Sequence, residues 1–278
     1  MSTTNEDPRI AFARSTVGPV SVVDAPNLPS HLLQLVDPQG NTYVAKQHGS
    51  QTRYVQEAHA YMSWRRYLQN HAPELVARQD STHTLLITAL PGHNGDALPP
   101  GSDEEARAHH DAGAVLRVLH QATHRRATAG TGAALADRLR GWVARADHAS
   151  LLSHAERKIL LRTADELAGS RMDSAVCHLD YQPRNWHVGN GFWTYDFEHM
   201  RRDARIRDFA RLHFRCWQSA PRLREAFFTG YGNRLRDAEQ RLMDRFGAIE
   251  AVTALVRGHG QDDVALSTHG RTVLSQLS

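Results

Sequence analysis

Short apolar runs separated by turn residues dominate the first third of the chain and predict β-strands. Residues 31–36 and 42–47 form two such runs, and the Asp-Pro-Gln-Gly segment at 37–40 between them is typical of a tight turn. A further apolar run at 84–90 is stopped by a Pro-Gly pair. We therefore expect a small antiparallel sheet in this part of the chain.

Two other segments complete the expected N-terminal part. Residues 17–23 are predicted to form the first strand, after an irregular lead-in over residues 1–16. Apolar side chains recur at helical spacing through residues 52–69 and predict a helix that follows the third strand. A strand-rich segment with one helix is typical of a small β-rich lobe.

The pattern becomes helical after residue 91. Ser102 and Ser153 are each followed by a glutamate three residues later, which is the capping-box arrangement at a helix N-terminus. We expect one helix to begin at each serine and another to lie between them. The later segments expected to be helical are 207–218, 221–230, 233–246, 248–257 and, after a turn at 258–260, a short helix at 273–277.

Two β-prone runs around a glycine-rich turn follow in the stretch 186–195. The runs are 186–188 and 192–195, and the Gly-Asn-Gly segment between them has the chemistry of a hairpin turn. Pro183 precedes them and is incompatible with a helix interior, so the chain from Asp180 to Asn185 is expected to be a loop. The sequence therefore predicts a β-hairpin directly after a polar loop.

This hairpin is expected to bring three oxygen-bearing side chains together. Asn185 at its start and Asp196 at its finish should be neighbours, with Asp180 one loop away. An amide and a carboxylate are hard oxygen ligands that suit Mg²⁺ shared with the phosphates of a nucleotide. A separate aspartate suits acceptance of a proton from a hydroxyl nucleophile. The alternative is an ordinary hairpin whose polar residues cap neighbouring helices.

The spacing of these residues resembles a known catalytic segment. His178-x-Asp180-x4-Asn185, followed by x10-Asp196-x-Glu198, is similar to the catalytic loop and metal-binding segment of the aminoglycoside phosphotransferase and choline kinase-like family, which has a protein-kinase-like fold. The resemblance implies Asp180 as catalytic base and Asn185 and Asp196 as metal ligands. It also implies that His178 organises the loop.

Three neighbouring positions refine the resemblance. Asp208, in Arg-Asp-Phe-Ala-Arg-Leu, resembles the aspartate of this family that opens the following helix and braces the catalytic loop. Glu198 resembles an acidic residue that assists a second metal or meets the substrate, and a solvated helix cap is its alternative role. Leu179 departs from the pattern, because the family usually has glycine there, and this departure bears on the backbone path of the loop.

Lys46 is one of only two lysines in the chain, and it lies inside the apolar run at 42–47. Val-Ala-Lys on a strand, followed by Glu57 on a helix, resembles the lysine–glutamate pair of kinases. The ammonium would hold the α- and β-phosphates of a nucleotide, and the carboxylate would hold the ammonium in place. A surface lysine and a solvated glutamate are the alternative.

The other nucleotide contacts are expected from position. The sequence has neither a Gly-x-Gly-x-x-Gly loop nor a Walker motif, so the segment 27–30 is expected to cover the phosphates, with Ser30 offering its hydroxyl and its N–H. The run 84–90 would end in the hinge, where the backbone of Ala89 and Leu90 would pair with adenine. An ordinary turn and a simple connector are the alternatives.

Together these features predict an α+β fold of the bilobal protein-kinase-like type. A small antiparallel β-rich N-terminal lobe would span residues 1–90 and bind ATP or GTP with Mg²⁺. A mostly helical C-terminal lobe would span residues 91–278 and carry the catalytic loop and the acceptor site. The nucleotide would lie in the cleft between the lobes.

Composition indicates the cellular location and the kinds of partner that we expect. The 278 residues include 33 basic and 30 acidic side chains and two cysteines. No apolar run approaches the roughly 20 residues that span a bilayer. The basic residues form no cluster with interleaved aromatic residues, which disfavours nucleic acid as a partner. We therefore expect a cytoplasmic monomer or dimer that binds neither membrane nor nucleic acid.

These expectations favour an ATP- or GTP-dependent O-phosphotransferase that acts on a hydroxyl of a small molecule. A protein kinase is disfavoured, because the loop lacks the arginine of His-Arg-Asp and the stretch 196–208 is too short for an activation segment. A non-catalytic nucleotide-binding scaffold is supported only by Leu179 and by the missing glycine loop.

The acceptor is less constrained than the reaction. By analogy with the family it is an antibiotic of the aminoglycoside or cationic peptide type, phosphorylated as a resistance mechanism. A small metabolite such as an amino alcohol or a sugar is the alternative. A cationic acceptor needs an acidic pocket, for which the candidates are Glu198, Asp203, Glu225, Glu239 and Asp244.

Overall fold

The computed structural model describes residues 6–25 and 28–277 of the chain. Contacts within it define two compact units. The first unit extends to Ala97 and includes Pro183–Arg201, whereas the second consists of Leu98–Gln182 and the chain from Arg202 onward. The expected lobes, 1–90 and 91–278, remain a prediction about domains.

The first unit begins with a helix that the sequence pattern did not reveal. α1 (Pro8–Val17) occupies most of the segment expected to be irregular, so that expectation was wrong. The strand expected over 17–23 is reduced to β1 (Ser21–Val22). The side chain of Asp7 caps α1 by accepting a hydrogen bond from the backbone N–H of Arg9 at 2.8 Å.

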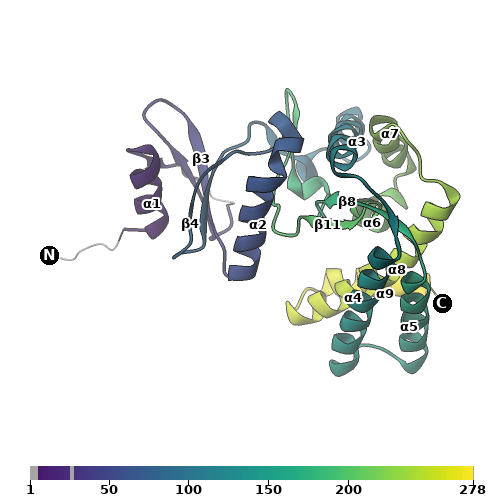
Figure 1. Ribbon diagram of the computed structural model, residues 1–278. Helices are drawn as coiled ribbons and strands as arrows, with labels where there is room; N and C mark the ends of the chain where they lie inside the picture. Colours follow the sequence, from purple (N-terminus) through teal and green to yellow (C-terminus); the bar gives the residue numbers. More distant parts are fainter. Residues whose placement is uncertain (1–5, 26–27, 278) are drawn as a thin grey trace. The chain divides into compact units, whose positions relative to one another are not determined.

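The sheet of the first unit is antiparallel, as expected, and its strands run in the order β1-β2-β3-β5-β4. The four strands after β1 are β2 (Leu32–Val36), β3 (Thr42–Gln47), β4 (Leu75–Gln79) and β5 (Thr84–Thr88). α1 lies against this sheet (Figure 1), and Phe12 of α1 shares a buried core with Leu35, Ala45 and Leu86. This core fixes β3, the strand that carries Lys46.

The helix after β3 is shorter than expected. α2 (Gln51–Ser63) ends at Trp64, whereas the sequence pattern predicted a helix to residue 69. A 3₁₀ segment, η1 (Arg65–His71), follows, and Gln69 within it has a φ of +50°. The backbone already leaves α-helical geometry at Trp64, whose φ is −121°, and the positive φ of Gln69 prevents the helix from resuming before residue 69.

The predicted hairpin is present in the first unit. β9 (Trp186–Val188) pairs antiparallel with β10 (Phe192–Thr194). A short strand, β6 (His93–Asn94), pairs with β9 and completes a three-stranded sheet. The loop before the hairpin closes with a 3₁₀ turn, η3 (Pro183–Asn185). The hairpin is therefore attached to the first unit by strand pairing.

The second unit is mostly helical, as expected. α3 (Asp103–Thr123) and α5 (His154–Ala168) begin at the two predicted capping serines, whose hydroxyls accept hydrogen bonds from backbone N–H groups. The other α-helices are α4 (Ala129–His148), α6 (Arg207–Leu212), α7 (Pro221–Tyr231), α8 (Asp237–Gly260) and α9 (Val264–Ser275). Within the described ranges, no helix combines the length and the apolar character that crossing a bilayer requires.

α3 and α7 lie side by side in this unit (Figure 1). Gly230 of α7 permits the close approach, because a Cβ there would lie 1.8 Å from the carbonyl oxygen of His110 in α3. The contact brings the end of α7 against α3, where the Tyr231 hydroxyl lies 2.9 Å from Nδ1 of His120. Nearby, β8 (Met172–Cys177) leads directly into the predicted catalytic loop.

The C-terminal helices differ from expectation. α8 is continuous where two helices and a turn at 258–260 were expected, and α9 is longer than the helix expected at 273–277. Gly258 stays helical because it packs against α9, and a Cβ there would lie 2.3 Å from Oγ of Ser267. The helix expected over 207–218 is α6 followed by a π-helical turn, His213–Trp217.

Glu250 of α8 joins three helical elements of the second unit. It is 8% exposed, and its Oε1 accepts hydrogen bonds from Nε of Arg215, in the π-helical turn, at 2.6 Å and from Nε2 of His269, in α9, at 3.1 Å. Burial would raise the pKa of Glu250, but the hydrogen bond from His269 and the charge of Arg215 lower it to about 2. The carboxylate is therefore ionised in the folded protein at neutral pH.

We expect Glu250→Gln to lower the free energy of unfolding at pH 7 by about 2 kcal/mol, because it weakens the charge-assisted hydrogen bonds that the buried carboxylate accepts from Arg215 and His269. The contribution of wild-type Glu250 is complete above pH 4.5 and is lost as the pH falls toward 2, since its pKa is lowered on folding. The variant should therefore lose less stability over that acid range. Urea unfolding at several pH values measures both effects.

Glu166→Gln is the matched control for this prediction. It removes an exposed ion pair with Arg245, whose Nε lies 2.9 Å from the glutamate. We expect the control to change the unfolding free energy by less than about 1 kcal/mol. Equal losses in the two variants would contradict a structural role for the buried carboxylate.

Candidate active site

Lys46 is buried between two carboxylates of the first unit. Its Nζ lies 2.7 Å from Oε2 of Glu57 and 2.6 Å from Oδ1 of Asp196. The side chain of Lys46 is 10% exposed and that of Glu57 is 1% exposed. Burial alone would lower the pKa of Lys46, but attraction to Glu57 and Asp196 raises it above its ordinary value. Lys46 is therefore a fixed positive charge oriented by two acids.

Glu57 is held by further contacts around its carboxylate. Its Oε1 accepts a hydrogen bond from the backbone N–H of Phe197 at 3.2 Å, and Nε2 of His48 lies 3.0 Å from its Oε2. Burial would raise the pKa of Glu57, but Lys46 and His48 lower it below its ordinary value. This carboxylate thus connects α2, the end of β3 and the segment after the hairpin.

The hairpin brings Asn185 next to the segment that carries Asp196. Trp186 pairs with Thr194, and the N–H of Tyr195 donates to the Asn185 carbonyl at 3.2 Å. Asn185 therefore contacts the residue immediately before Asp196. Asp196 has a φ of +67°, a left-handed conformation that aspartate adopts more readily than most residues.

Glu198 lies two residues beyond Asp196 and is only partly exposed. Its Oε1 is 3.3 Å from Nη1 of Arg53 and 3.4 Å from Nε2 of His199, and its side chain is 16% exposed. Burial raises the pKa of Glu198, and the negative charge of Asp196 raises it further. Burial and Asp196 therefore oppose the negative charge of Glu198, and the nearby Arg53 favours it.

The oxygen donors of the first unit suit a hard divalent cation. Asn185 offers an amide oxygen, and Asp196 and Glu198 offer carboxylates. Mg²⁺ is bound in proteins through one or two carboxylates and keeps its other positions for phosphate and water oxygens. The charges agree with this chemistry, because the single charge of Lys46 faces the carboxylates of both Glu57 and Asp196. The donor set therefore fits Mg²⁺ better than a thiolate-seeking metal.

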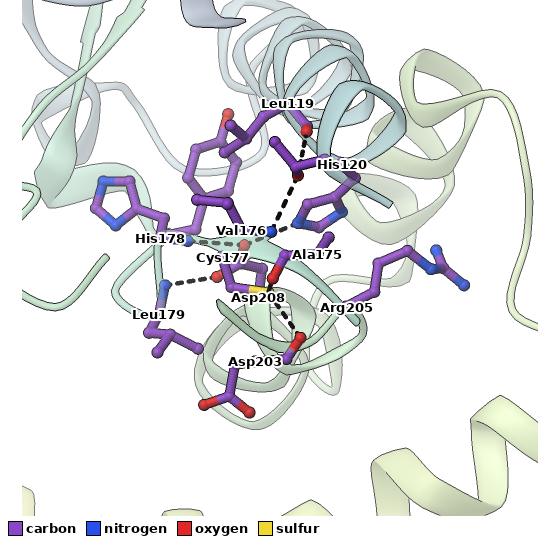
Figure 2. A network of polar contacts seen from close by, with 12 residues as sticks. Leu119, His120, Ala175, Val176, Cys177, His178, Leu179, Asp203, Arg205 and Asp208 are labelled. Carbon is purple, nitrogen blue, oxygen red and sulfur yellow. Dashed lines mark hydrogen bonds and ion pairs between the residues drawn. The ribbon is translucent and has the colours of Figure 1, made fainter. Parts of the chain in front are cut away.

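Asp208 holds the predicted catalytic loop of the second unit. Its Oδ2 accepts a hydrogen bond from the N–H of His178 at 2.9 Å, and its Oδ1 accepts one from the N–H of Leu179 at 2.5 Å (Figure 2). Nε2 of His120 donates to Oδ2 at 2.9 Å. A buried carboxylate that receives three N–H groups is a strong anchor. The loop backbone is thus fixed by a side chain of α6.

Leu179 adopts the backbone conformation that glycine favours. Its φ is +65°, in the left-handed region, and its side chain is buried. A non-glycine residue in this region is strained by about 1–2 kcal/mol, and the paired N–H bonds to Asp208 offset that strain. The departure from the family pattern at this position therefore changes the side chain and leaves the turn of the loop intact.

Asp180 is buried, and two side chains contact its carboxylate. Gln182 Nε2 donates to Oδ1 of Asp180, and Arg211 forms an ion pair with the same oxygen. Nδ1 of His178 accepts a hydrogen bond from the N–H of Asp180 at 3.4 Å. Burial lowers the pKa of Arg211 to about 10, so its guanidinium keeps its charge at neutral pH. The sequence analysis did not predict Gln182 and Arg211, because their spacing from Asp180 in the sequence does not indicate a contact.

The remaining predicted nucleotide contacts have other partners here. Ser30 is exposed, and its carbonyl accepts a hydrogen bond from Nη1 of Arg9 at 2.7 Å. Asn27, at the start of the segment expected to cover the phosphates, lies outside the described residues. The N–H of Ala89 donates a hydrogen bond to the carbonyl of Thr42 in β3 at 3.0 Å, so this N–H already has a partner in the sheet. Pairing of Ala89 and Leu90 with adenine remains a prediction.

One further group of potential metal ligands occurs in the described part of the chain, and it consists of His120, Cys177 and Asp208. Both ring nitrogens of His120 already have hydrogen-bond partners. Burial raises the pKa of the Cys177 thiol well above its usual value, which disfavours the thiolate that a metal needs. We therefore interpret this group as a hydrogen-bonded cluster.

We expect Asp208→Asn to lower the free energy of unfolding by about 3 kcal/mol, because an amide has one acceptor oxygen where the carboxylate has two and cannot match the charge-assisted bonds. Urea unfolding measures the change. Asp165→Asn, at a side chain that is 74% exposed, is the control and should stay within about 0.5 kcal/mol of wild type. A small loss in the Asp208 variant would show that the loop does not depend on this anchor.

The chain is similar to a phosphotransferase family in sequence and to several phosphotransferases in structure. Residues 32–244 match the phosphotransferase enzyme family, whereas no curated protein matches the chain in sequence. The gentamicin–APH(2″)-IIa complex has a TM-score of 0.68 and 12% identity, over 99% of this chain and 97% of that chain.

Two other solved structures give comparable similarity. Macrolide 2′-phosphotransferase type I has a TM-score of 0.66 and 17% identity, over 100% of this chain and 98% of that chain. A choline/ethanolamine kinase family protein from Mesorhizobium loti has a TM-score of 0.66 and 16% identity, over 97% and 94%. At such identities these likenesses concern the fold, and they confirm the predicted α+β protein-kinase-like class.

The family assignment rests on the sequence match, which covers most of the chain and includes both the strand of Lys46 and the loop of Asp180. The predicted resemblance and the predicted enzyme class are thereby confirmed. The chain belongs to the phosphotransferase enzyme family, and it is a phosphotransferase of the small-molecule kinase class.

Proposed function

We propose that the chain is an ATP- or GTP-dependent O-phosphotransferase that phosphorylates a hydroxyl group of a small molecule. The observation that carries this proposal is the buried ammonium of Lys46 between the carboxylates of Glu57 and Asp196. Ion clusters of this kind add little net stability, because desolvation opposes their attraction, so a role in ligand binding explains them better. The α- and β-phosphates of a nucleotide are the ligand that suits an oriented ammonium.

Mg²⁺ is the cofactor that we propose for the same cluster. Asn185 and Asp196 would hold it, and Glu198 is a further oxygen donor. When bound, the ion supplies positive charge that stabilises the transferring phosphoryl group. Asp196 would then face both Lys46 and the cation, so that this one carboxylate aligns the two positive groups that contact the phosphates.

Asp180 is the base in this proposal. The acceptor oxygen would attack the terminal phosphorus, its proton would pass to Asp180, and the bond to the nucleoside diphosphate would break. Arg211 forms an ion pair with Oδ1 of Asp180, and Gln182 donates a hydrogen bond to the same oxygen. Phosphoryl transfer depends mainly on positioning and electrostatics, so we propose Arg211 and Gln182 as positioning residues.

An antibiotic acceptor is supported by analogy. The structurally similar proteins are named for gentamicin, for macrolides and for choline or ethanolamine. Phosphorylation of an antibiotic hydroxyl as a resistance mechanism is therefore one candidate function of this chain. The analogy is one of fold, so the acceptor must be identified by chemistry.

Charge pairing in the second unit favours the other candidate, a small metabolite. A polycationic antibiotic needs acidic side chains that are not already matched by donors. Four of the five proposed acids belong to this unit. Three of them pair with arginines, Asp203 with Arg138, Glu225 with Arg234 and Glu239 with Arg205, while Asp244 accepts a hydrogen bond from the neutral Gln240. An acceptor with few positive charges, such as a sugar or an amino alcohol, suits these surroundings better.

A coupled assay of nucleoside diphosphate release tests the function directly. The purified chain, with ATP or GTP and Mg²⁺, is presented with aminoglycosides, macrolides, amino alcohols and sugars. We expect release that depends on one acceptor class, and mass spectrometry should show one added phosphoryl group on a hydroxyl. Release with no acceptor dependence, or nucleotide binding with no turnover, would favour the non-catalytic scaffold.

We expect Asp180→Ala to reduce turnover of the best acceptor by about 100-fold or more, because the acceptor hydroxyl loses its proton acceptor. Nucleotide affinity should persist, since Asp180 is not proposed to contact the nucleotide. Steady-state kinetics and nucleotide titration measure the two quantities. Asp137→Ala, at a side chain that is 77% exposed, is the control, and unchanged turnover in the Asp180 variant would remove it from the base role.

We expect Asp196→Ala to weaken binding of the Mg²⁺–nucleotide complex by at least the roughly tenfold that loss of an outer-sphere partner costs a metal site. Affinity for nucleotide without Mg²⁺ should change much less. Calorimetric titration with and without Mg²⁺ separates the two. Glu74→Ala, at an exposed position of the same unit, is the control. Equal affinities in the variant and the wild type would contradict the ligand assignment.

The competing functions have less support. The scaffold alternative relied on Leu179, yet this residue keeps the left-handed conformation that glycine would adopt. The protein kinase alternative still lacks an activation segment of sufficient length. A cytoplasmic location, a monomeric or dimeric state, and the expectation of neither nucleic acid nor membrane as partner stay predictions.

A further inference from the structure

A pocket lies in the second unit, and the proposed reaction makes no use of it. Its volume of about 470 Å³ falls within the range of small-molecule sites. Its charged lining includes four arginines and two carboxylates: Arg117, Arg205, Arg234, Arg236, Asp173 and Glu239. We call this site the arginine pocket. Its lining has an excess of positive charge.

Both carboxylates of the arginine pocket are already engaged. Glu239 pairs with Arg205 and accepts hydrogen bonds from Arg236, with 3.3 Å between its Oε2 and Nε of that arginine. Asp173 lies 3.4 Å from Nε2 of His124. Burial would raise the pKa of Glu239, but hydrogen bonds from Arg236 lower it below its ordinary value. The two acids therefore offset only part of the arginine charge, although Arg234 also pairs with Glu225, which lies outside the pocket lining.

Arg117 is the group of the pocket with capacity for a ligand. Among the residues that the structure describes it has no ion-pair partner, and its Nε is buried without a hydrogen bond. A buried N–H without an acceptor is destabilising, and native proteins rarely leave one. An anion in the pocket would lie against the Arg117 side chain and would match its unpaired charge.

A chain of hydrogen bonds leads from this pocket to the catalytic loop. Nη1 of Arg205 donates to the hydroxyl of Tyr231 at 2.9 Å. That hydroxyl lies 2.9 Å from Nδ1 of His120, whose Nε2 lies 2.9 Å from Oδ2 of Asp208. Asp208 in turn holds the loop backbone, as Figure 2 shows. The first three members of this chain line the pocket.

The donors and acceptors in this series of hydrogen bonds can be arranged in one direction only. The carboxylate of Asp208 accepts, so Nε2 of His120 carries a proton. Burial lowers the pKa of His120, which keeps the ring neutral, and its Nδ1 then accepts from the Tyr231 hydroxyl. Burial raises the pKa of Tyr231 to about 12, so that hydroxyl keeps its proton. A change in the contacts of Arg205 therefore alters each following bond in turn.

We propose that the arginine pocket is a second ligand site, which binds inorganic phosphate or a phosphomonoester, and that Tyr231 and His120 transmit its occupancy to Asp208. The several acceptor oxygens of such an anion match the N–H groups of Arg117 and its neighbours. Binding does not depend on the proposed reaction, whereas an effect on turnover rests on the role of Asp180 in that reaction.

Calorimetric titration with inorganic phosphate tests the binding step. We expect Arg117→Gln to lower the affinity at least about tenfold, since a charged hydrogen-bonded contact is lost. Arg117→Lys should recover part of it, because the charge remains. Arg162→Gln, at an exposed position of α5, is the matched control. Lys46→Met should leave phosphate affinity unchanged, which separates this site from the proposed nucleotide site.

A sugar phosphate and the free sugar distinguish the two sources of the anion. Tighter binding of the sugar phosphate than of inorganic phosphate would assign the pocket to a phosphomonoester, and equal affinity would assign it to the free anion. The free sugar should not bind at all. Sulfate is a further probe of anion binding in the same titration. Circular dichroism of each variant verifies that the fold is retained.

Hydrogen–deuterium exchange tests the transmission step. We expect saturating phosphate to slow exchange in the peptide that covers residues 177–182, whose His178 and Leu179 amides donate to Asp208. Tyr231→Phe should still bind phosphate but should lose this protection, because the variant lacks the hydroxyl that joins Arg205 to His120 by hydrogen bonds. A merely structural Tyr231 would change stability without separating binding from protection.

Three results would overturn the proposal. Phosphate that does not bind, or that binds equally to wild type and to a folded Arg117→Gln, would remove the pocket as an anion site. Loss of phosphate binding in Lys46→Met alone would assign the anion to the first unit. Phosphate binding without any change in exchange at 177–182 in the wild type would remove the transmission.

Discussion

The ammonium of Lys46 is the charge on which the first unit depends. It is almost fully buried, and a buried charge is tolerated only with close partners, which here are Glu57 and Asp196. The three groups come from β3, α2 and the segment after the hairpin, which are far apart in the sequence. One ion cluster therefore holds the sheet, the helix and the hairpin of this unit in a common arrangement, and it presents an oriented cation of the kind that binds phosphates.

The second unit is organised around a buried negative charge. Asp208 accepts hydrogen bonds from the backbone of His178 and Leu179, and from the ring of His120. These bonds stabilise a left-handed turn at Leu179 that would otherwise be strained. Asp180 follows in this turn, with its carboxylate held by Arg211. The loop is thus preorganised by contacts within its own unit, as electrostatic catalysis requires.

Local patterns predicted much of this arrangement. The hairpin at 186–194, the capping serines of α3 and α5, and the strand of Lys46 follow from turn chemistry, capping and apolar alternation, which act between residues close in sequence. α1 was not predicted because four of its apolar residues are consecutive, at 10–13, so its ten residues give almost no helical periodicity. Two contacts depend on how helices distant in sequence pack: Arg211 with Asp180, and Tyr231 with His120. No spacing in the sequence indicates them. The roles of Asp180, Asn185 and Asp196 were inferred by resemblance, and they remain hypotheses to be tested.

Lysine side-chain NMR tests the central claim most directly. The chain contains only Lys46 and Lys158, so ¹⁵N labelling of lysine gives two side-chain signals, and the exposed Lys158 serves as an internal control. Titration with Mg²⁺ and a non-hydrolysable nucleotide should shift the Nζ signal of Lys46 and leave that of Lys158 in place. An unmoved Lys46 signal at saturating nucleotide would contradict the account, because the buried ammonium would then have no contact with the phosphates.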